Sequence, residues 1–117
     1  MGKTVVVVGA SPKPERYSNI ALKMLRDMGH AVIPVNPAFD EIEGIPVRRD
    51  LRDISEPIDT VTMYVGPDRG EALIGDIAAL KPRRVILNPG AESSEIRRSL
   101  EAKGIEVLVV RPISSFT

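Results

Sequence analysis

The residues best suited to chemistry follow a run of apolar residues, Thr4–Val8, near the start of the chain. Glycine permits close approach of a ligand to the backbone, and lysine, arginine and the free N–H groups at a helix start attract anions. The loop therefore predicts a site for a phosphorylated ligand, and its alternative is a solvated loop with ordinary surface charges. The candidate residues of this loop are Gly9, Ala10, Ser11, Lys13, Arg16 and Ser18.

The loop departs from the fingerprint of dinucleotide-binding proteins. That fingerprint would need glycines at positions 11 and 14, where the chain has Ser11 and Pro14. An NAD site also uses an acidic residue after the second strand, and the chain has Asn36-Pro37 there. Asp40 and Glu41 follow a few residues later, so the missing acidic residue does not fully exclude an NAD site. The residues disfavour a nicotinamide cofactor on two counts.

The elements that must position this loop follow from the hydrophobic pattern. Short apolar runs alternate with segments of helical period, which is typical of parallel strands joined by crossover helices. With 117 residues, we expect a single domain over residues 1–117. Its fold class is α/β, a Rossmann-like three-layer sandwich with a five-stranded parallel sheet in the order 3-2-1-4-5. The expected strands are Thr4–Val8, Ala31–Val35, Thr60–Val65, Arg84–Leu87 and Ile105–Val110.

The first helix has a predicted start and a predicted buried face. Ser18 is a residue type that favours the N-cap position. Ile20, Met24, Leu25 and Met28 recur at helical spacing. We expect Met24 and Met28 to pack in the core.

The expected strand order places the functional crevice. In an open sheet of this order the winding direction reverses between strands 1 and 4, and ligands bind at the carboxyl ends of those strands. Two turns would flank the crevice, residues 9–14 after strand 1 and Asn88-Pro89-Gly90 after strand 4. The first turn carries the cations and is the more informative.

Three segments of the chain resemble the small CoA-binding protein family, which is related to the nucleotide-binding domain of the succinyl-CoA synthetase alpha subunit. They are residues 8–11 (Val-Gly-Ala-Ser), 13–18 (Lys-Pro-Glu-Arg-Tyr-Ser) and 29–37 (Gly-His-Ala-Val-Ile-Pro-Val-Asn-Pro). Weaker similarity at 43–47, 58–61 and 88–90 extends the resemblance over most of the chain.

The resemblance implies binding of coenzyme A or an acyl-CoA through the first loop and the crevice between strands 1 and 4. The diphosphate would lie on Gly9, Ala10, Ser11 and Lys13, with Arg16 and Ser18 adding contacts to a phosphate at the helix start. The adenosine side would be lined by Val35, Asn36 and Pro37, and the cleft bordered by Tyr64, Val65 and Gly66. The pantetheine arm would face Asn88 and Gly90, although relatives often have a glutamine in that turn.

The residues do not supply an active site. The phosphorylated histidine of the synthetase alpha subunit lies in a second domain, and the single histidine here, His30, lies at the amino end of strand 2. No serine stands in a G-x-S-x-G motif, and neither histidines nor carboxylates have metal-ligand spacing. We therefore expect a non-enzymatic binding protein. The alternatives are the CoA-binding subunit of a split acyl-CoA synthetase and an NAD(P)-binding redox-sensing module.

The amino-acid composition limits the kinds of partner that the chain is expected to bind. A formal net charge of zero and 3% aromatic residues argue against a nucleic-acid or anionic-membrane surface. No apolar run reaches transmembrane length and no signal pattern opens the chain, so we expect a cytoplasmic location. A homodimer through an edge strand or through the tail, Arg111–Thr117, is a further expectation.

Overall fold

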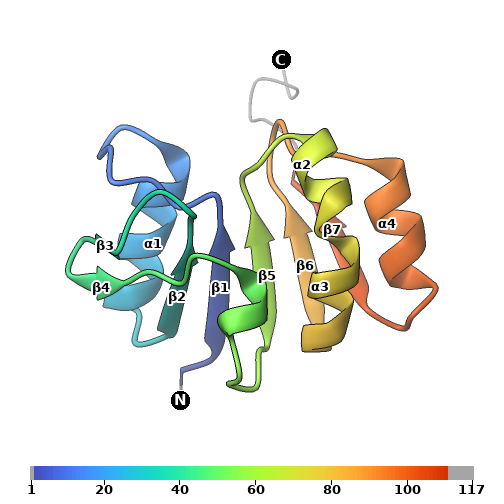
Figure 1. The fold of residues 1–117 in the computed structure, drawn as a ribbon, viewed down its shortest axis with the longest axis horizontal. Helices are drawn as coiled ribbons and strands as arrows, with labels where there is room; N and C mark the ends of the chain where they lie inside the picture. The colour runs from blue at the N-terminus through green and yellow to red at the C-terminus, as the bar shows by residue number, and fades with distance from the viewer. Residues whose placement is uncertain (1, 111–117) are drawn as a thin grey trace.

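A five-stranded parallel sheet runs through the centre of the computed structural model, which describes residues 2–110 (Figure 1). In space its strands follow the order β2-β1-β5-β6-β7. The strands are β1 (Thr4–Val8), β2 (Ala31–Val35), β5 (Thr60–Met63), β6 (Arg84–Leu87) and β7 (Glu106–Val109). A small antiparallel hairpin lies beyond β2 and comprises β3 (Glu41–Ile42) and β4 (Ile45–Pro46).

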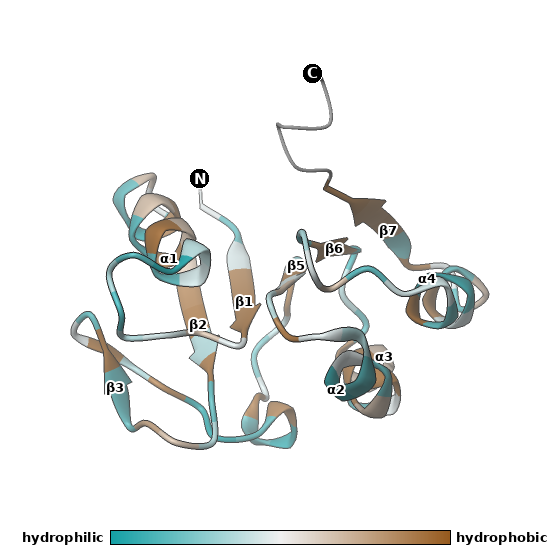
Figure 2. Cartoon of the chain, turned by 90° about the horizontal axis from the view of Figure 1, so that it is seen from above, coloured by the Kyte–Doolittle hydropathy of each residue, from teal (hydrophilic) through white to brown (hydrophobic). Residues whose placement is uncertain are grey.

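Helices cover the two faces of the sheet unequally. From above, α1 lies on one face, whereas α2, α3 and α4 lie together on the other (Figure 2). The single turn of 3-10 helix, η1, packs with the second group, because its Leu51 belongs to the same apolar cluster as α3 and α4. The helical segments are α1 (Tyr17–Asp27), η1 (Leu51–Asp53), α2 (Pro67–Ala72), α3 (Ile74–Leu80) and α4 (Ser94–Glu101).

The expected fold class is confirmed, but the expected strand order is wrong. Counting only the strands of the main sheet, the order is 2-1-3-4-5 rather than 3-2-1-4-5. The third strand, β5, pairs in parallel with β1 through Val5↔Thr60 to Val8↔Met63. It therefore lies in the middle of the sheet, and β2 lies at the edge.

The path of the chain between β2 and β5 explains this difference. It places η1, Ile54 and Ile58 on the face that is opposite to α1. A right-handed crossover on that face brings the next strand to the far side of β1, whereas a crossover on the α1 face would have carried it past β2. Both routes satisfy the handedness rule, so the rule could not decide between them.

The core forms two apolar clusters, one on each side of the sheet. Successive residues of β1 alternate between them, since Val6 and Val8 join the larger cluster and Val7 joins the smaller one. This is the pattern of a strand buried on both faces, as its unbroken run of valines predicted. The smaller cluster is closed by Leu22 of α1 and Ile42 of the hairpin, both fully buried.

Helix α1 differs from its prediction in both start and orientation. The helix begins at Tyr17 with Arg16 in the N-cap position, and Ser18 is a buried residue of the first turn rather than the cap. Its buried residues are Ser18, Asn19 and Leu22. Met24 is 57% exposed and Met28 is also exposed, so the prediction that they are core residues is wrong.

Within 2–110, no helix combines the length and apolar character that crossing a membrane would need. The tail at residues 111–117, one of the two expected routes to a homodimer, lies outside the described residues.

The two faces of α1 predict opposite responses to truncation. Leu22→Ala should lower the free energy of unfolding by about 2–5 kcal/mol, because it leaves a cavity in a fully buried site. Met24→Ala, two residues further along, should change it by less than about 0.5 kcal/mol in dilute solution. Chemical denaturation of both variants measures the difference, and equal losses would contradict the observed orientation of α1.

Candidate functional site

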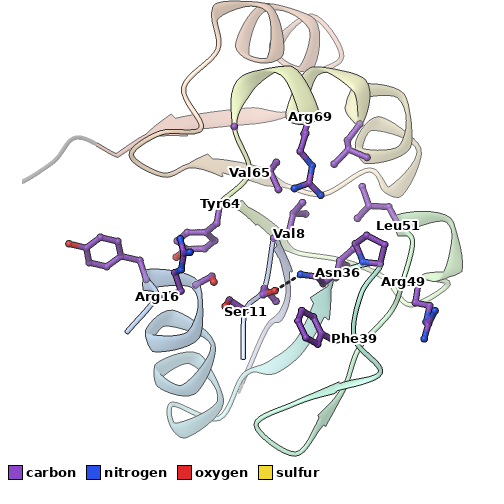
Figure 3. A pocket seen from close by; sticks show the side chains of 18 of the residues that line it. Val8, Ser11, Arg16, Asn36, Phe39, Arg49, Leu51, Tyr64, Val65 and Arg69 are labelled. Atoms are coloured by element: carbon purple, nitrogen blue, oxygen red, sulfur yellow. Dashed lines mark hydrogen bonds between the residues drawn. The ribbon is translucent and has the colours of Figure 1, made fainter. Parts of the chain in front are cut away.

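A pocket of about 880 Å³ lies at the carboxyl ends of β1 and β5 (Figure 3). These are the strands between which the winding direction of the observed sheet reverses. The expected crevice between strands 1 and 4 is therefore corrected to one between the first and third strands, because β5 separates β1 from β6. The carboxyl-end rule remains valid, and only the neighbouring strand changes.

Gly9 lets the chain leave β1 and turn at the floor of this pocket. Its φ is +84°, and an added Cβ would lie 2.9 Å from Val65 Cγ1 and 3.3 Å from the backbone of Tyr64. The amides of Gly9 and Ala10 both donate to the carbonyl oxygen of Val35, at 3.1 and 3.3 Å. The loop after β1 is thus pressed against β5 on one side and tied to β2 on the other.

Two asparagines fix the next two carbonyl groups of the loop. Asn36 Nδ2 donates to the carbonyl oxygen of Ala10 at 2.8 Å, and Asn19 Nδ2 donates to that of Ser11 at 2.9 Å. Because both oxygens are occupied, they do not offer free negative dipoles to a bound anion. Asn19 is fully buried and was missed from the sequence, where it reads as an ordinary residue of an amphipathic helix.

The charges that line the pocket are predominantly positive. Lys13, Arg16 and Arg69 line it, and none of them forms an ion pair within the described part of the chain. The fourth lining cation, Arg49, is paired with a carboxylate outside the pocket lining, that of Asp40, at 2.6 Å. These groups make the mouth of the pocket attractive to phosphate.

The one acidic side chain among the lining residues is already neutralised. Asp50 accepts hydrogen bonds from the guanidinium and from the backbone amide of Arg52. The side-chain bond from Arg52, followed by the backbone bond, lowers the pKa of Asp50 to about 2. Its charge is therefore compensated locally at neutral pH and does not oppose anion binding.

The lining of the pocket also contains residues that the sequence did not reveal. Arg69 extends from α2 into the pocket between Val65 and Leu51 (Figure 3). Phe39 contributes an aromatic ring from the segment after β2. A usable signal for Arg69 existed, because Gly66-Pro67 marks a helix start directly after a strand that ends at the carboxyl edge of the sheet.

Tyr64 supplies a neutral polar group to the lining of the pocket. The Tyr64 side chain packs against the smaller apolar cluster and also lines the pocket. Burial raises the pKa of the Tyr64 phenol, partly opposed by a hydrogen bond with Thr62. The hydroxyl consequently stays protonated at neutral pH and remains able to donate a hydrogen bond.

Most of the predicted site residues come together in this pocket, and two do not. The pocket is lined by Gly9, Ala10, Ser11, Lys13, Arg16, Ser18, Val35, Asn36, Pro37, Tyr64, Val65 and Gly66. From the turn after β6 only Pro89 lines it. The Asn88 amide points into the sheet, donating to Thr62 Oγ1 at 2.7 Å and to the carbonyl oxygen of Met63 at 2.9 Å. The Gly90 amide donates to Glu92 Oε1 at 2.7 Å.

The residues that might support catalysis lie elsewhere or are not grouped. His30 Nδ1 accepts from the backbone amide of Lys3 at 3.0 Å, at the amino end of the sheet and so opposite the pocket. Among residues 2–110, histidine and acidic side chains form no cluster of three that could hold a metal ion.

Comparison with known proteins identifies the family. The family model described as "CoA binding domain" matches residues 3–113, and the chain belongs to that family. The uncharacterized protein YneT of Bacillus subtilis is 40% identical over 62 residues, which cover 53% of this chain and 46% of YneT. An acetate–CoA ligase (ADP-forming) of Methanocaldococcus jannaschii is 32% identical over 63 residues, covering 54% of this chain and 9% of the ligase. The chain thus spans about half or less of these relatives.

A solved structure extends the similarity over the whole fold. A conserved hypothetical protein from Pyrococcus furiosus is 37% identical, with a TM-score of 0.83. The match covers 98% of this chain and 99% of that protein. The predicted resemblance to small CoA-binding proteins is therefore confirmed at the level of the family.

The close approach at Gly9 predicts a difference between two glycine substitutions. Gly90→Ala adds only the strain of a positive φ, since no atom lies within 4 Å of the added Cβ, and should cost about 1–2 kcal/mol. Gly9→Ala adds the collision with Val65 to the same strain and should cost about 2–4 kcal/mol. Denaturant unfolding of both variants compares them, and equal costs would show that the loop can move away from β5.

Proposed function

We propose that the protein binds coenzyme A or an acyl-CoA at the carboxyl ends of β1 and β5 and catalyses no reaction by itself. The observation that carries this proposal is a set of three cations around the Gly9 turn of a chain from the CoA binding domain family. They are Lys13, Arg16 and Arg69, which form no ion pair among residues 2–110. Coenzyme A is strongly anionic at its nucleotide end, and charge-assisted hydrogen bonds are the strong ones.

The dimensions and lining of the pocket fit such a ligand. Its volume of about 880 Å³ falls in the range of small-molecule sites, ~300–1,000 Å³. Lys13 and Arg16 flank the start of α1, so the diphosphate is assigned to this side, together with the free N–H groups of the helix start. Val35, Asn36 and Pro37 form the side assigned to adenosine.

The pantetheine arm is reassigned relative to the sequence expectation. Because Asn88 and Gly90 do not line the pocket, the arm is assigned to Tyr64, Val65 and Pro89. Val65 is apolar and Tyr64 presents a neutral hydroxyl, which suits an uncharged chain with amide groups. The turn after β6 would then contact the ligand through Pro89 alone.

The same geometry argues against a nicotinamide dinucleotide. The Asn36 side chain, at the end of β2, is engaged by the Ala10 carbonyl and by the Ala38 amide. Asp40 is held by Arg49, and neither Asp40 nor Glu41 lines the pocket. The acidic acceptor that NAD sites use for the ribose hydroxyls has no free counterpart at this position.

Removal of the pocket cations should weaken binding of CoA. Lys13→Ala and Arg69→Ala should each raise the dissociation constant for CoA about tenfold or more, since each removes a charged partner of a phosphate. The control is Lys103→Ala, which removes an exposed lysine that does not line the pocket and should leave affinity unchanged. Calorimetric titration of ligand-stripped protein measures all three.

Ligand fragments test which end of CoA is recognised. 3′-Phospho-ADP should compete with CoA far better than pantetheine does, because pantetheine lacks the phosphates that form charge-assisted hydrogen bonds with the cations. Saturating CoA should also raise the melting temperature more than NAD(H), NADP(H) or ATP does. No binding of CoA or acetyl-CoA, or a larger shift with a nicotinamide cofactor, would overturn the proposed function.

A second candidate function is the CoA-binding subunit of an acyl-CoA synthetase assembled from separate chains. The similarity to ADP-forming acetate–CoA ligases, of which this chain matches 9% of the length, favours it. The test is reconstitution with a ligase that lacks its corresponding domain. CoA-dependent formation of acetyl-CoA in the mixture, lost with Lys13→Ala, would support this function, and no product would contradict it.

A further inference from the structure

One half of the α1 face of the sheet has no helix over it within residues 2–110 (Figure 2). The strand register shows this along a single row of side chains. Val7 pairs with Thr62, Thr62 with Ile86, and Ile86 with Leu108. Exposure rises along the row from 0% at Val7 to 41% at Leu108.

The corresponding row of side chains on the other face of the sheet stays buried along its whole length. Val6, Val61 and Val85 are fully buried and Val107 is nearly so, because α3 and α4 cover them. The exposure of Leu108 therefore reflects the lack of a covering helix among residues 2–110 and not its position near the edge. Val110, two residues further on and on the same side, is also 41% exposed. Ile86, Leu108 and Val110 form an apolar surface that we term the sheet floor.

Helix α1 presents a second unpartnered apolar surface beside this floor. Its exposed apolar side chains are Tyr17, Ile20, Met24 and Met28, which we term the α1 stripe. Asn19 and Arg26 contact Glu43 of the hairpin. At about 100° per residue, Tyr17, Met24 and Met28 fall on the flank of α1 opposite to these two. The hairpin lies beyond β2, on the side of α1 away from β5, β6 and β7 (Figure 1). The stripe, on the flank of α1 opposite to the hairpin, consequently faces solvent on the side nearer those three strands.

We propose that a second copy of this chain covers both surfaces in a two-fold symmetric dimer. In this arrangement the α1 helix of each copy lies on the sheet floor of the other, so the two α1 helices lie side by side between the two sheets. The helix would contact its own sheet through Leu22 and the partner through the stripe. A symmetric interface requires that the same patch be complementary to itself. The combined patch meets this requirement, because within residues 2–110 the floor has no helix over it and the stripe beside it has no packing partner.

Area and charge support a second copy as the occupant. The exposed apolar side chains of the floor and stripe present on the order of several hundred Å² per copy, near the ~800 Å² that each partner contributes to a standard interface. Arg84 and Glu106, 3.4 Å apart, border the floor. Lys23 and Asp27 lie along one side of the stripe on α1, so each border carries both signs of charge. With a formal net charge of zero, two copies do not repel one another.

Sedimentation of the ligand-free protein between micromolar and near-millimolar concentrations tests the dimer. We expect a concentration-dependent dimer, and we expect Met24→Lys and Leu108→Lys each to raise its dissociation constant at least tenfold. The control is Ala79→Lys, which places the same charge at an exposed alanine of α3 on the other side of the sheet and should not affect association. Met24 and Leu108 do not line the pocket, so unchanged melting of the monomers and unchanged CoA binding would show intact folding.

The proposed contact can also be tested directly, because the chain has no cysteine. Met24→Cys chains mixed with Leu108→Cys chains should form the heterologous disulfide-linked dimer on oxidation. A protein that is monomeric at every concentration, or a dimer that survives both lysine variants, would overturn the proposal. Dimerisation that appears only after deletion of residues 111–117 would also overturn it, since that segment would then be the occupant.

Discussion

The position of the β1–α1 loop depends on the burial of β1 between two strands. Because β1 pairs with β2 on one side and β5 on the other, its carboxyl end cannot move without breaking the sheet. Gly9 continues this constraint into the loop through the contact with Val65 and the hydrogen bonds to Val35. The asparagines at 19 and 36 then orient the next peptide groups. The cations of the loop are thus carried by a backbone that is fixed before any ligand binds, which reduces the ordering cost of binding.

The route from β2 to β5 determines the rest of the architecture. By crossing the face opposite α1, the chain places β5 next to β1 and brings Tyr64, Val65 and Arg69 to the pocket. The same route packs η1, α2, α3 and α4 on one face. Among residues 2–110, α1 is then the only helix on the other face, where it covers β1 but not β6 and β7. The pocket and the uncovered sheet floor are therefore two consequences of one choice of crossover.

The sequence predicted those features of the fold that short-range residue patterns determine. The valine run of β1, the strand at Ala31–Val35 and the loop at residues 9–13, which lines the pocket, were located because each has a local signature. The strand order was not, since the side on which a crossover packs depends on long-range contacts of Leu51, Ile54 and Ile58. Periodicity also placed Met24 and Met28 on one face of α1 but assigned them to the core, because spacing cannot show whether an apolar face has a partner. Asn88 was expected at the ligand, and its inward hydrogen bonds to Thr62 and Met63 depend on the tertiary structure.

The central claim is that the pocket at β1 and β5 holds the nucleotide end of coenzyme A. The measurement that tests it most directly is a crystal structure of the protein grown with saturating CoA. We expect the diphosphate of CoA to lie within hydrogen-bonding distance of the loop at residues 9–13, with the adenine beside Val35 and Pro37. CoA bound at another surface, or no CoA in this pocket at saturating concentration, would contradict the account.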